Sequence, residues 1–215
     1  MKSKKKYSMF FVLVLVALMF SSCSTKKNSW VNRKYHNLTA KYNGYFNGKE
    51  SLKKGIKQIY KDHKDDYSTI LPVYKIRDLE KEKKAHTHMD KAIRKGSVVI
   101  QKHSMKIKGK EYCKWVDDNY LLVGKGYFYK GEFNEAIKTF LYIKNEYSKN
   151  EIRFSASIWA LRSYVQKGDF LSAELELSEL KQEKRMPNKF NLDFVLASAE
   201  YYLFTKNTDL ALEQL

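Results

Sequence analysis

Two pairs of side chains in this chain are of the types that bind metals or catalyse reactions. His86 and His88 would supply half of a metal site, but no Cys or carboxylate stands near them at ligand spacing. We therefore expect a solvated loop there and no bound metal. Asp117 and Asp118 are candidates for a catalytic pair. Adjacent residues of a helix point about 100° apart, so we expect these carboxylates to face solvent or a basic neighbour and not one substrate atom.

Cys113 is a candidate nucleophile because a thiol can react once it is deprotonated. It stands alone in an aromatic-rich stretch, where a Cys is more often part of the packing than reactive. The sequence contains no catalytic triad, no ligand set and no cofactor motif. It therefore predicts a protein that is not an enzyme and holds no cofactor.

The second cysteine, Cys23, ends a segment with the pattern of a secretory leader. Residues 1–8 carry four Lys, Met9–Phe20 are twelve consecutive apolar residues, and Ser21-Ser22 precede the Cys. Twelve residues are too few to span a bilayer, so the pattern predicts a cleaved signal peptide over residues 1–22. A Cys after two small residues resembles the signal of bacterial lipoproteins. That resemblance implies a lipid on the Cys23 thiol, and ordinary secretion with a chance Cys is the alternative.

Residues 23–29 form a short polar tether after the leader, and no Asp follows Cys23. By resemblance to lipoproteins of Gram-negative bacteria, this implies an outer-membrane protein that faces the periplasm. Acyl chains contribute about 0.8 kcal/mol per buried CH₂, so several of them would anchor the chain to the membrane firmly.

The formal charge of the chain is +17, and removing residues 1–22 takes away four Lys and no acid, which leaves +13. Such a balance suggests nucleic acid, anionic lipid or an acidic partner. An exported, tethered protein does not meet chromosomal DNA, so we expect no nucleic acid. The remaining candidates are lipid phosphates, the carboxylates of peptidoglycan and an acidic protein.

The elements that carry these residues are predicted to be helical throughout, because no stretch alternates apolar and polar residues long enough to form a sheet. From Tyr120 to Ser148 the residue intervals match the tetratricopeptide pattern. Gly124 and Ala136 are small where the two helices of a repeat cross, and Tyr127 and Phe140 are the aromatic residues beside that crossing.

The same columns recur 37 and 38 residues further along the chain. KGEF at Lys130–Phe133 returns as KGDF at Lys167–Phe170, Ala136 as Ala173 and Ala211, Tyr127 as Tyr164 and Tyr202, and Phe140 as Leu177 and Leu215. The sequence therefore predicts an all-α, right-handed solenoid of tetratricopeptide-type helical hairpins over 111–215. Its repeats span about 111–148, 152–186 and 189–215. Three unrelated amphipathic helix pairs are the alternative.

The third of these repeats is incomplete and has no polar capping helix. We therefore expect the chain to be the N-terminal part of a longer array that frays from about Asn188 when it is alone.

Residues 30–110 are predicted to be a helical region with a loop at 63–88. Trp30–Asp62 indicates a helix pair that turns at Asn47-Gly48, and Met89–His103 indicates a further helix before a basic turn at Lys106–Lys110. The apolar face of the first helix consists of Leu38, Tyr42, Tyr45 and Phe46. The loop is expected to pack its short apolar piece, Ile70–Tyr74, against neighbouring helices.

Four lysines on the second helix of that predicted pair are four residues apart, so they lie on one side: Lys49, Lys53, Lys57 and Lys61. This Lys stripe is either a solvated face or a surface for an anionic partner near the lipid anchor.

By resemblance to tetratricopeptide arrays, the first helix of each repeat lines a concave groove. The groove positions are Asp118, Leu121, Lys125, Phe128, Ile158, Arg162 and Val165. The resemblance implies exposed apolar positions for the side chains of a peptide, with Lys125 and Arg162 pairing with its carboxylates. Leu121 and Lys125 stand where the chaperone-binding clamp of other arrays needs Lys and Asn, so we do not expect chaperone tails to bind. A purely structural groove is the alternative.

WVNRKYHNLTAKYNGYFNGKESLKKGI at Trp30–Ile56 and EYCKWVDDNYLLVGKGYFYKGEF at Glu111–Phe133 resemble the large tetratricopeptide lipoproteins of Bacteroidota that serve gliding motility and type IX secretion. The resemblance covers most of residues 23–150. It implies a non-enzymatic scaffold in an envelope assembly that couples outer-membrane secretion components to an inner-membrane motor. The alternatives are an assembly lipoprotein for outer-membrane β-barrels and a peptidoglycan-binding accessory protein.

Overall fold

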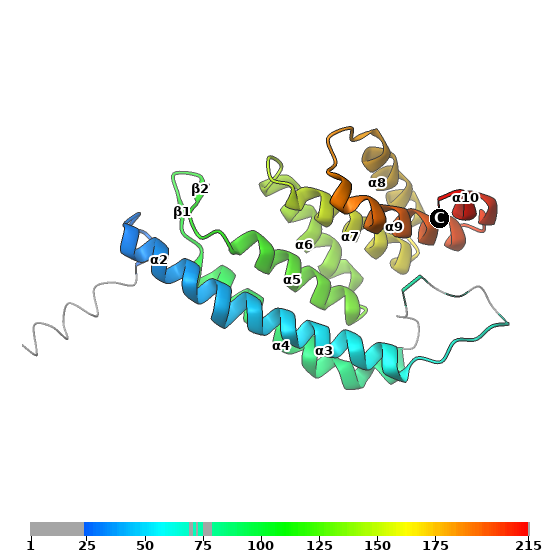
Figure 1. The fold of residues 1–215 in the computed structure, drawn as a ribbon, viewed down its shortest axis with the longest axis horizontal. Helices are drawn as coiled ribbons and strands as arrows, with labels where there is room; N and C mark the ends of the chain where they lie inside the picture. Colours follow the sequence, from blue (N-terminus) through cyan, green and yellow to red (C-terminus); the bar gives the residue numbers. More distant parts are fainter. Residues whose placement is uncertain (1–23, 69–70, 72, 75–78, 215) are drawn as a thin grey trace, which may run out of the picture.

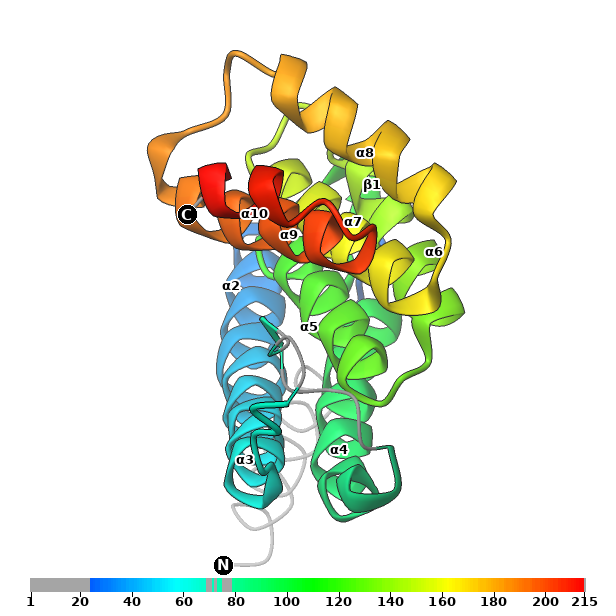
Figure 2. The same ribbon diagram turned by 90° about the vertical axis from the view of Figure 1, so that its right-hand side faces the viewer.

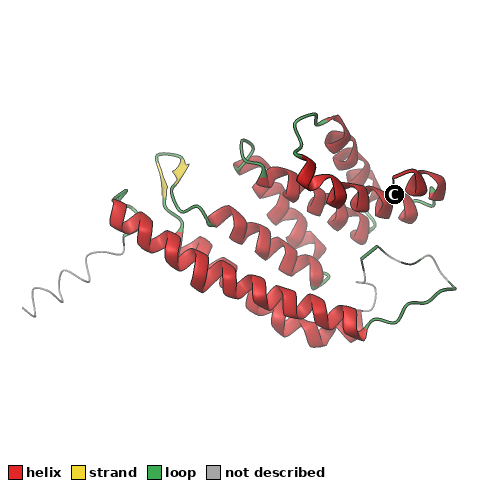
Figure 3. Ribbon diagram, in the orientation of Figure 1, coloured by secondary structure: helices red, strands yellow, loops and turns green. Residues whose placement is uncertain are grey.

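The computed structural model describes residues 24–68, 71, 73–74 and 79–214. These residues form an all-α protein whose helices pack as sequential antiparallel pairs, with one short β-hairpin (Figures 1 and 3). The predicted signal peptide, Cys23, Pro72 and Leu215 lie outside the described residues.

Residues 30–62 form one continuous helical segment and not the predicted helix pair. It consists of α2 (Trp30–Thr39), the π-helical η1 (Ala40–Phe46) and α3 (Asn47–Asp62). The prediction of a turn at Asn47-Gly48 was therefore wrong. Gly48 instead lets α3 approach the Leu122 side chain closely, because a Cβ at position 48 would lie only 2.6 Å from that side chain. Gly44 meets the Val99 side chain in the same way, so the glycines let the long helix lie tightly against α4 and α5.

The π-helical stretch η1 keeps one side of this long helix turned toward the core. The buried positions recur every four residues from Asn32 to Gly48, an interval that exceeds the 3.6 residues of an α-helical turn. A π-helix bonds i to i+5 and so has wider turns, which compensates for the drift. The opposite side is exposed. The expectation that Leu38, Tyr42 and Phe46 pack was therefore wrong, and only Tyr45 of that predicted face packs, against Trp115.

Helix α4 (Leu79–His103) lies antiparallel beside the long helix, and Figure 2 shows the two side by side below the later helices. Because α4 begins at Leu79, the predicted loop at 63–88 was wrong for its last ten residues. The predicted basic turn at Lys106–Lys110 forms a β-hairpin of β1 (Lys106–Ile107) and β2 (Lys110–Glu111). Lys108 and Gly109 both have positive φ, as a two-residue hairpin turn requires.

Three helix pairs follow the hairpin, where the sequence predicts repeats. They are α5 (Val116–Tyr129) with α6 (Phe133–Glu146), α7 (Ile152–Lys167) with α8 (Phe170–Gln182), and α9 (Asn191–Phe204) with α10 (Thr208–Gln214). A 3-10 turn, η2 (Asn188–Phe190), leads into α9.

The turns inside these three pairs have the same geometry. Gly131, Gly168 and Lys206 occupy the left-handed region, with φ of 75°, 81° and 62°. The N–H of the next residue donates to the carbonyl of a Tyr five residues earlier in each pair: Glu132 to Tyr127, Asp169 to Tyr164 and Asn207 to Tyr202. The equivalent Ala136, Ala173 and Ala211 are buried. These positions are the predicted columns, so the repeat spacing of the three pairs is confirmed.

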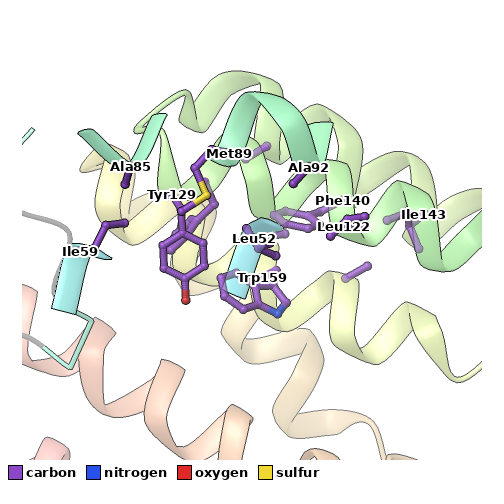
Figure 4. Packing of buried hydrophobic residues seen from close by; sticks show 14 residues of the cluster. Leu52, Ile59, Ala85, Met89, Ala92, Leu122, Tyr129, Phe140, Ile143 and Trp159 are labelled. Atoms are coloured by element: carbon purple, nitrogen blue, oxygen red, sulfur yellow. The ribbon is translucent and has the colours of Figure 1, made fainter. Parts of the chain in front are cut away.

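The main core lies where the long helix and α4 meet the repeats, and Figure 4 shows it around Trp159. As predicted, Gly124 faces Phe140, whose ring leaves no room for a Cβ there. A second core cluster joins α7, α8, α9 and α10.

Candidate functional site

The predicted groove positions on α5 and α7 are called here the first-helix face. Four of the seven are buried in the core, and the prediction that they are exposed was wrong: Phe128, Ile158, Arg162 and Val165. The Phe128 ring packs edge-on against Trp159, with 5.0 Å between ring centroids. Ile158 and Val165 belong to the second core cluster. Side chains of the repeats themselves thus occupy the space that a peptide would need at these positions.

Other residues of this chain enclose the side chain of Arg162. Its side chain is 1% exposed. The guanidinium stacks between Tyr74 and Trp159, at 4.3 and 4.7 Å from their ring centroids. It donates a hydrogen bond of 3.0 Å to the carbonyl of Asp193 on α9. Arg162 therefore joins α7 to α9 and to the chain between α3 and α4, and it is not free to bind the carboxylate of another protein.

Tyr74 reaches this position from the connection between α3 and α4. Its ring lies 6.4 Å from that of Trp159, between centroids, and it packs on the main core. Burial raises the pKa of Tyr74 to about 12, while the nearby Arg162 charge lowers it. The prediction that the piece Ile70–Tyr74 packs against neighbouring helices is thus confirmed for Tyr74 and wrong for Leu71, which is exposed. Trp159, which contacts Tyr74, Phe128, Lys125 and Arg162, is not among the site residues that the sequence predicts.

The accessible part of the first-helix face is Asp118, Leu121 and Lys125, which are all partly exposed. The Lys125 ammonium lies 4.8 Å from the Trp159 ring centroid, and burial lowers its pKa to about 8. Burial also raises the pKa of Asp118 to about 6, with Asp117 adding to the shift and Lys49 and Lys125 opposing it. Near neutral pH, a small change of pH or the approach of a charged partner therefore changes the net charge of this surface.

Asp117 and Asp118 point to different places, as expected for adjacent residues of a helix. The Asp117 carboxylate accepts a hydrogen bond of 2.9 Å from the Asn150 side chain in the connection between α6 and α7. Asp118 instead lies in the field of Lys49 and Lys125. The two carboxylates thus have different neighbours.

Cys113 is buried, which confirms the packing interpretation. Its thiol lies 3.8 Å from the carbonyl oxygen of His36, and burial raises its pKa to about 11. His86 and His88 belong to α4 and not to a loop, so that part of the prediction was wrong. Within the described residues, no three His, Cys, Asp or Glu side chains gather in a group that could hold a metal ion.

Two histidines that no sequence motif marks form a partly buried pair. The Nδ1 atoms of His36 on α2 and His103 on α4 lie 2.9 Å apart. Burial lowers the pKa of both, and the charge of His36 lowers that of His103 further. The two residues are distant in the sequence, and no motif connects them.

The Lys stripe is exposed along its whole length on α3. None of its four ammonium groups forms an ion pair with another residue of the part that the structure describes. The stripe is thus free to meet solvent or an external anion, and both of the interpretations above stand.

No helix among the described residues has the length and the apolar character needed to cross a membrane. No protein-family model and no curated protein matches the chain.

Proposed function

We propose that this chain is a non-enzymatic scaffold for protein–protein interactions, built on a right-handed tetratricopeptide-type solenoid. The observation that carries the proposal is the turn geometry that recurs in the pairs α5–α6, α7–α8 and α9–α10. Helical repeats with one shared geometry stack into a continuous surface, and such surfaces bind other proteins.

The proposed setting is the periplasmic face of an outer membrane, with a lipid anchor on Cys23. The leader pattern at residues 1–22 and the resemblance of Trp30–Ile56 to tetratricopeptide lipoproteins support it. By the same resemblance, the partners are envelope proteins of a type IX secretion or gliding-motility assembly.

The partner surface that fits this function is the accessible part of the first-helix face. Leu121 offers an apolar contact, and Lys125, Asp118 and the nearby Lys49 offer charges of both signs. Since Arg162 and the apolar positions around it are inside the core, the surface is shorter than the sequence suggests. It suits a short mixed-charge segment of a partner.

A second candidate function is binding to peptidoglycan or anionic lipid, and the Lys stripe favours it. Lys53, Lys57 and Lys61 are exposed and have no ion-pair partners among the described residues, which leaves their charge available.

Photo-crosslinking from the first-helix face tests the proposal. A photoreactive amino acid replaces Leu121 in the full chain in its own cells, and mass spectrometry identifies the crosslinked proteins. We expect secretion or motility components. The control places the same amino acid at Leu175, which is 62% exposed on α8 and should not capture them. Capture of barrel-assembly components, or equal capture from both positions, would contradict the proposal.

A further inference from the structure

The long N-terminal helix carries an exposed apolar stripe that no described element covers. Its members are each between 43% and 66% exposed: Trp30, Val31, Tyr35, Leu38, Tyr42 and Phe46. Single exposed apolar residues are normal on a protein surface, but a contiguous group of this size marks an interaction site.

These six residues lie on one side of α2 and η1. From Val31 onward they follow at intervals of four, three, four and four residues, which is one helix face. The buried positions His36 and Ala40 face the opposite way, toward α4. The side chain of buried Asn32 donates to the carbonyls of Ser24 and Lys27. At about 1.5 Å per residue, the stripe is about 24 Å long.

Basic side chains border this stripe, and acidic ones are absent from its part of the sequence. Residues 24–49 contain six Lys or Arg and no Asp or Glu. The Lys34 ammonium lies 5.7 Å from the Trp30 ring centroid, and that of Lys41 lies 5.1 Å from the Tyr42 ring centroid. Trp and Tyr prefer the membrane–water interface, where Lys and Arg pair with anionic headgroups.

The Lys stripe continues the same exposed side of the helix. Lys53 follows Phe46 by seven residues, which is two helical turns, and Lys57 and Lys61 follow at intervals of four. One side of the long helix thus presents aromatic and apolar groups first and then a row of ammonium groups. An apolar face bordered by Lys and carrying Trp, Phe and Leu is the chemistry of a helix that lies in a lipid interface.

The position of the stripe in the chain points to the same occupant. Trp30 follows Cys23, the predicted lipid anchor, after only a short polar tether. We propose that α2 and η1 lie in the plane of a phospholipid surface, with the stripe among the headgroups and the basic side chains on lipid phosphates. This inference goes beyond the proposed scaffold function and holds whichever protein the repeats bind.

Fluorescence quenching by brominated lipid tests the proposal on the full chain. The protein is reconstituted into phosphatidylethanolamine–phosphatidylglycerol vesicles whose acyl chains carry bromine near the headgroup. In the Phe46→Trp variant, the new indole lies near the C-terminal end of the stripe and not beside Cys23 in the sequence, which separates the effect of the anchor from that of the stripe. The parent chain already contains Trp30, Trp115 and Trp159, so the emission of the new indole is the difference between the variant and the parent. We expect this difference to be lost in the brominated vesicles. A Leu175→Trp variant on α8 is the matched control, and its added emission should remain.

A third variant combines Phe46→Trp with Leu38→Ser and Tyr42→Ser. All three positions are exposed, so these changes leave the core intact, which circular dichroism checks. We expect this variant to stay with the vesicles while the quenching at position 46 is lost.

Three results would overturn the proposal. The first is an unquenched indole at position 46 in an anchored protein, because the helix would then stand away from the lipid. The second is crosslinked dimers through the stripe, which would make a second copy its occupant. The third is equal quenching in phosphatidylcholine vesicles, which would remove the role of the basic side chains. None of these results depends on the partners captured at Leu121.

Discussion

The partly buried pair of His36 and His103 is the clearest titratable feature at the scale of single residues. Their Nδ1 atoms share one hydrogen bond, so one ring must donate and the other must accept. Protonating both rings would place two like charges side by side in a partly buried position. The pKa of each is lowered by burial, so the folded protein holds this pair neutral.

This pair predicts that the protein loses stability in mild acid. As pH falls below about 6.5, unfolded histidines bind protons before the folded pair does, so the free energy of unfolding decreases. A His103→Gln variant should show a smaller drop in melting temperature between about pH 7.5 and about pH 5.5 than the parent chain. For a chain of this size, each kcal/mol corresponds to about 2–4 °C.

The control for this measurement is Gln101→Ala, an exposed position on the same helix, α4. Because it removes no titratable group, it should keep the full pH dependence of the parent chain. A His103→Gln variant whose melting temperature falls as far as that of the parent would show that the pair does not control stability.

Single residues also differ in how well the sequence predicts their surroundings. The burial of Cys113 follows from its aromatic neighbours in the chain. The burial of Arg162 does not, because Tyr74 and Asp193, which enclose it, come from other elements distant in the sequence. A helix pattern predicts which side a residue lies on, but not what will cover that side.

At the scale of elements, two turns between paired helices share one backbone geometry but have different residues at its left-handed position. Gly168 and Lys206 occupy the same left-handed position in successive repeats. Glycine adopts this conformation freely, whereas a residue with a Cβ is strained by about 1 kcal/mol. A Cβ at position 168 would meet no other atom within 4 Å, so the strain there depends on the backbone alone.

Exchanging these residues should move stability in opposite directions. Gly168→Lys should lower the free energy of unfolding by about 1 kcal/mol, as measured by chemical denaturation. Lys206→Gly should raise it by about 0.5 kcal/mol, because the greater freedom of glycine in the unfolded chain offsets part of the gain. Lys206→Ala is the control and should give no gain, since alanine keeps the strained backbone. Changes of the same sign for both exchanges would mean that the two turns are not equivalent.

The long helix shows where element prediction fails. Asn47-Gly48 has the composition of a turn, and local sequence alone favours that interpretation. The structure uses the missing Cβ of Gly48 to bring Leu122 close, an advantage that arises only once α5 is in place. The repeats were predictable because their signal recurs, whereas the continuity of Trp30–Asp62 depends on a distant partner.

At the scale of the whole molecule, stability is expected to be uneven along the chain. The pair α5–α6 packs between α4 and α7 and contributes many residues to the main core. Helix α10 buries Ala211, while its neighbours Leu210 and Leu212 are exposed. Elements with few buried apolar contacts open at low free energy.

Hydrogen exchange followed by residue should therefore show less protection in 208–214 than in 116–146. The second segment is the internal control, because both are measured in one sample. Equal protection of the two segments in a monomer would contradict this picture of the core.

The continuous helix of Trp30–Asp62 has a mechanical consequence. At about 1.5 Å per residue it is about 50 Å long, and α4 lies antiparallel along most of it. A pull on its N-terminal end along the axis loads these contacts in shear, so they resist together and do not peel apart one at a time. A flexible segment of the same composition would straighten before it transmitted any tension. The long helix therefore passes a load from its first turn directly to the repeats.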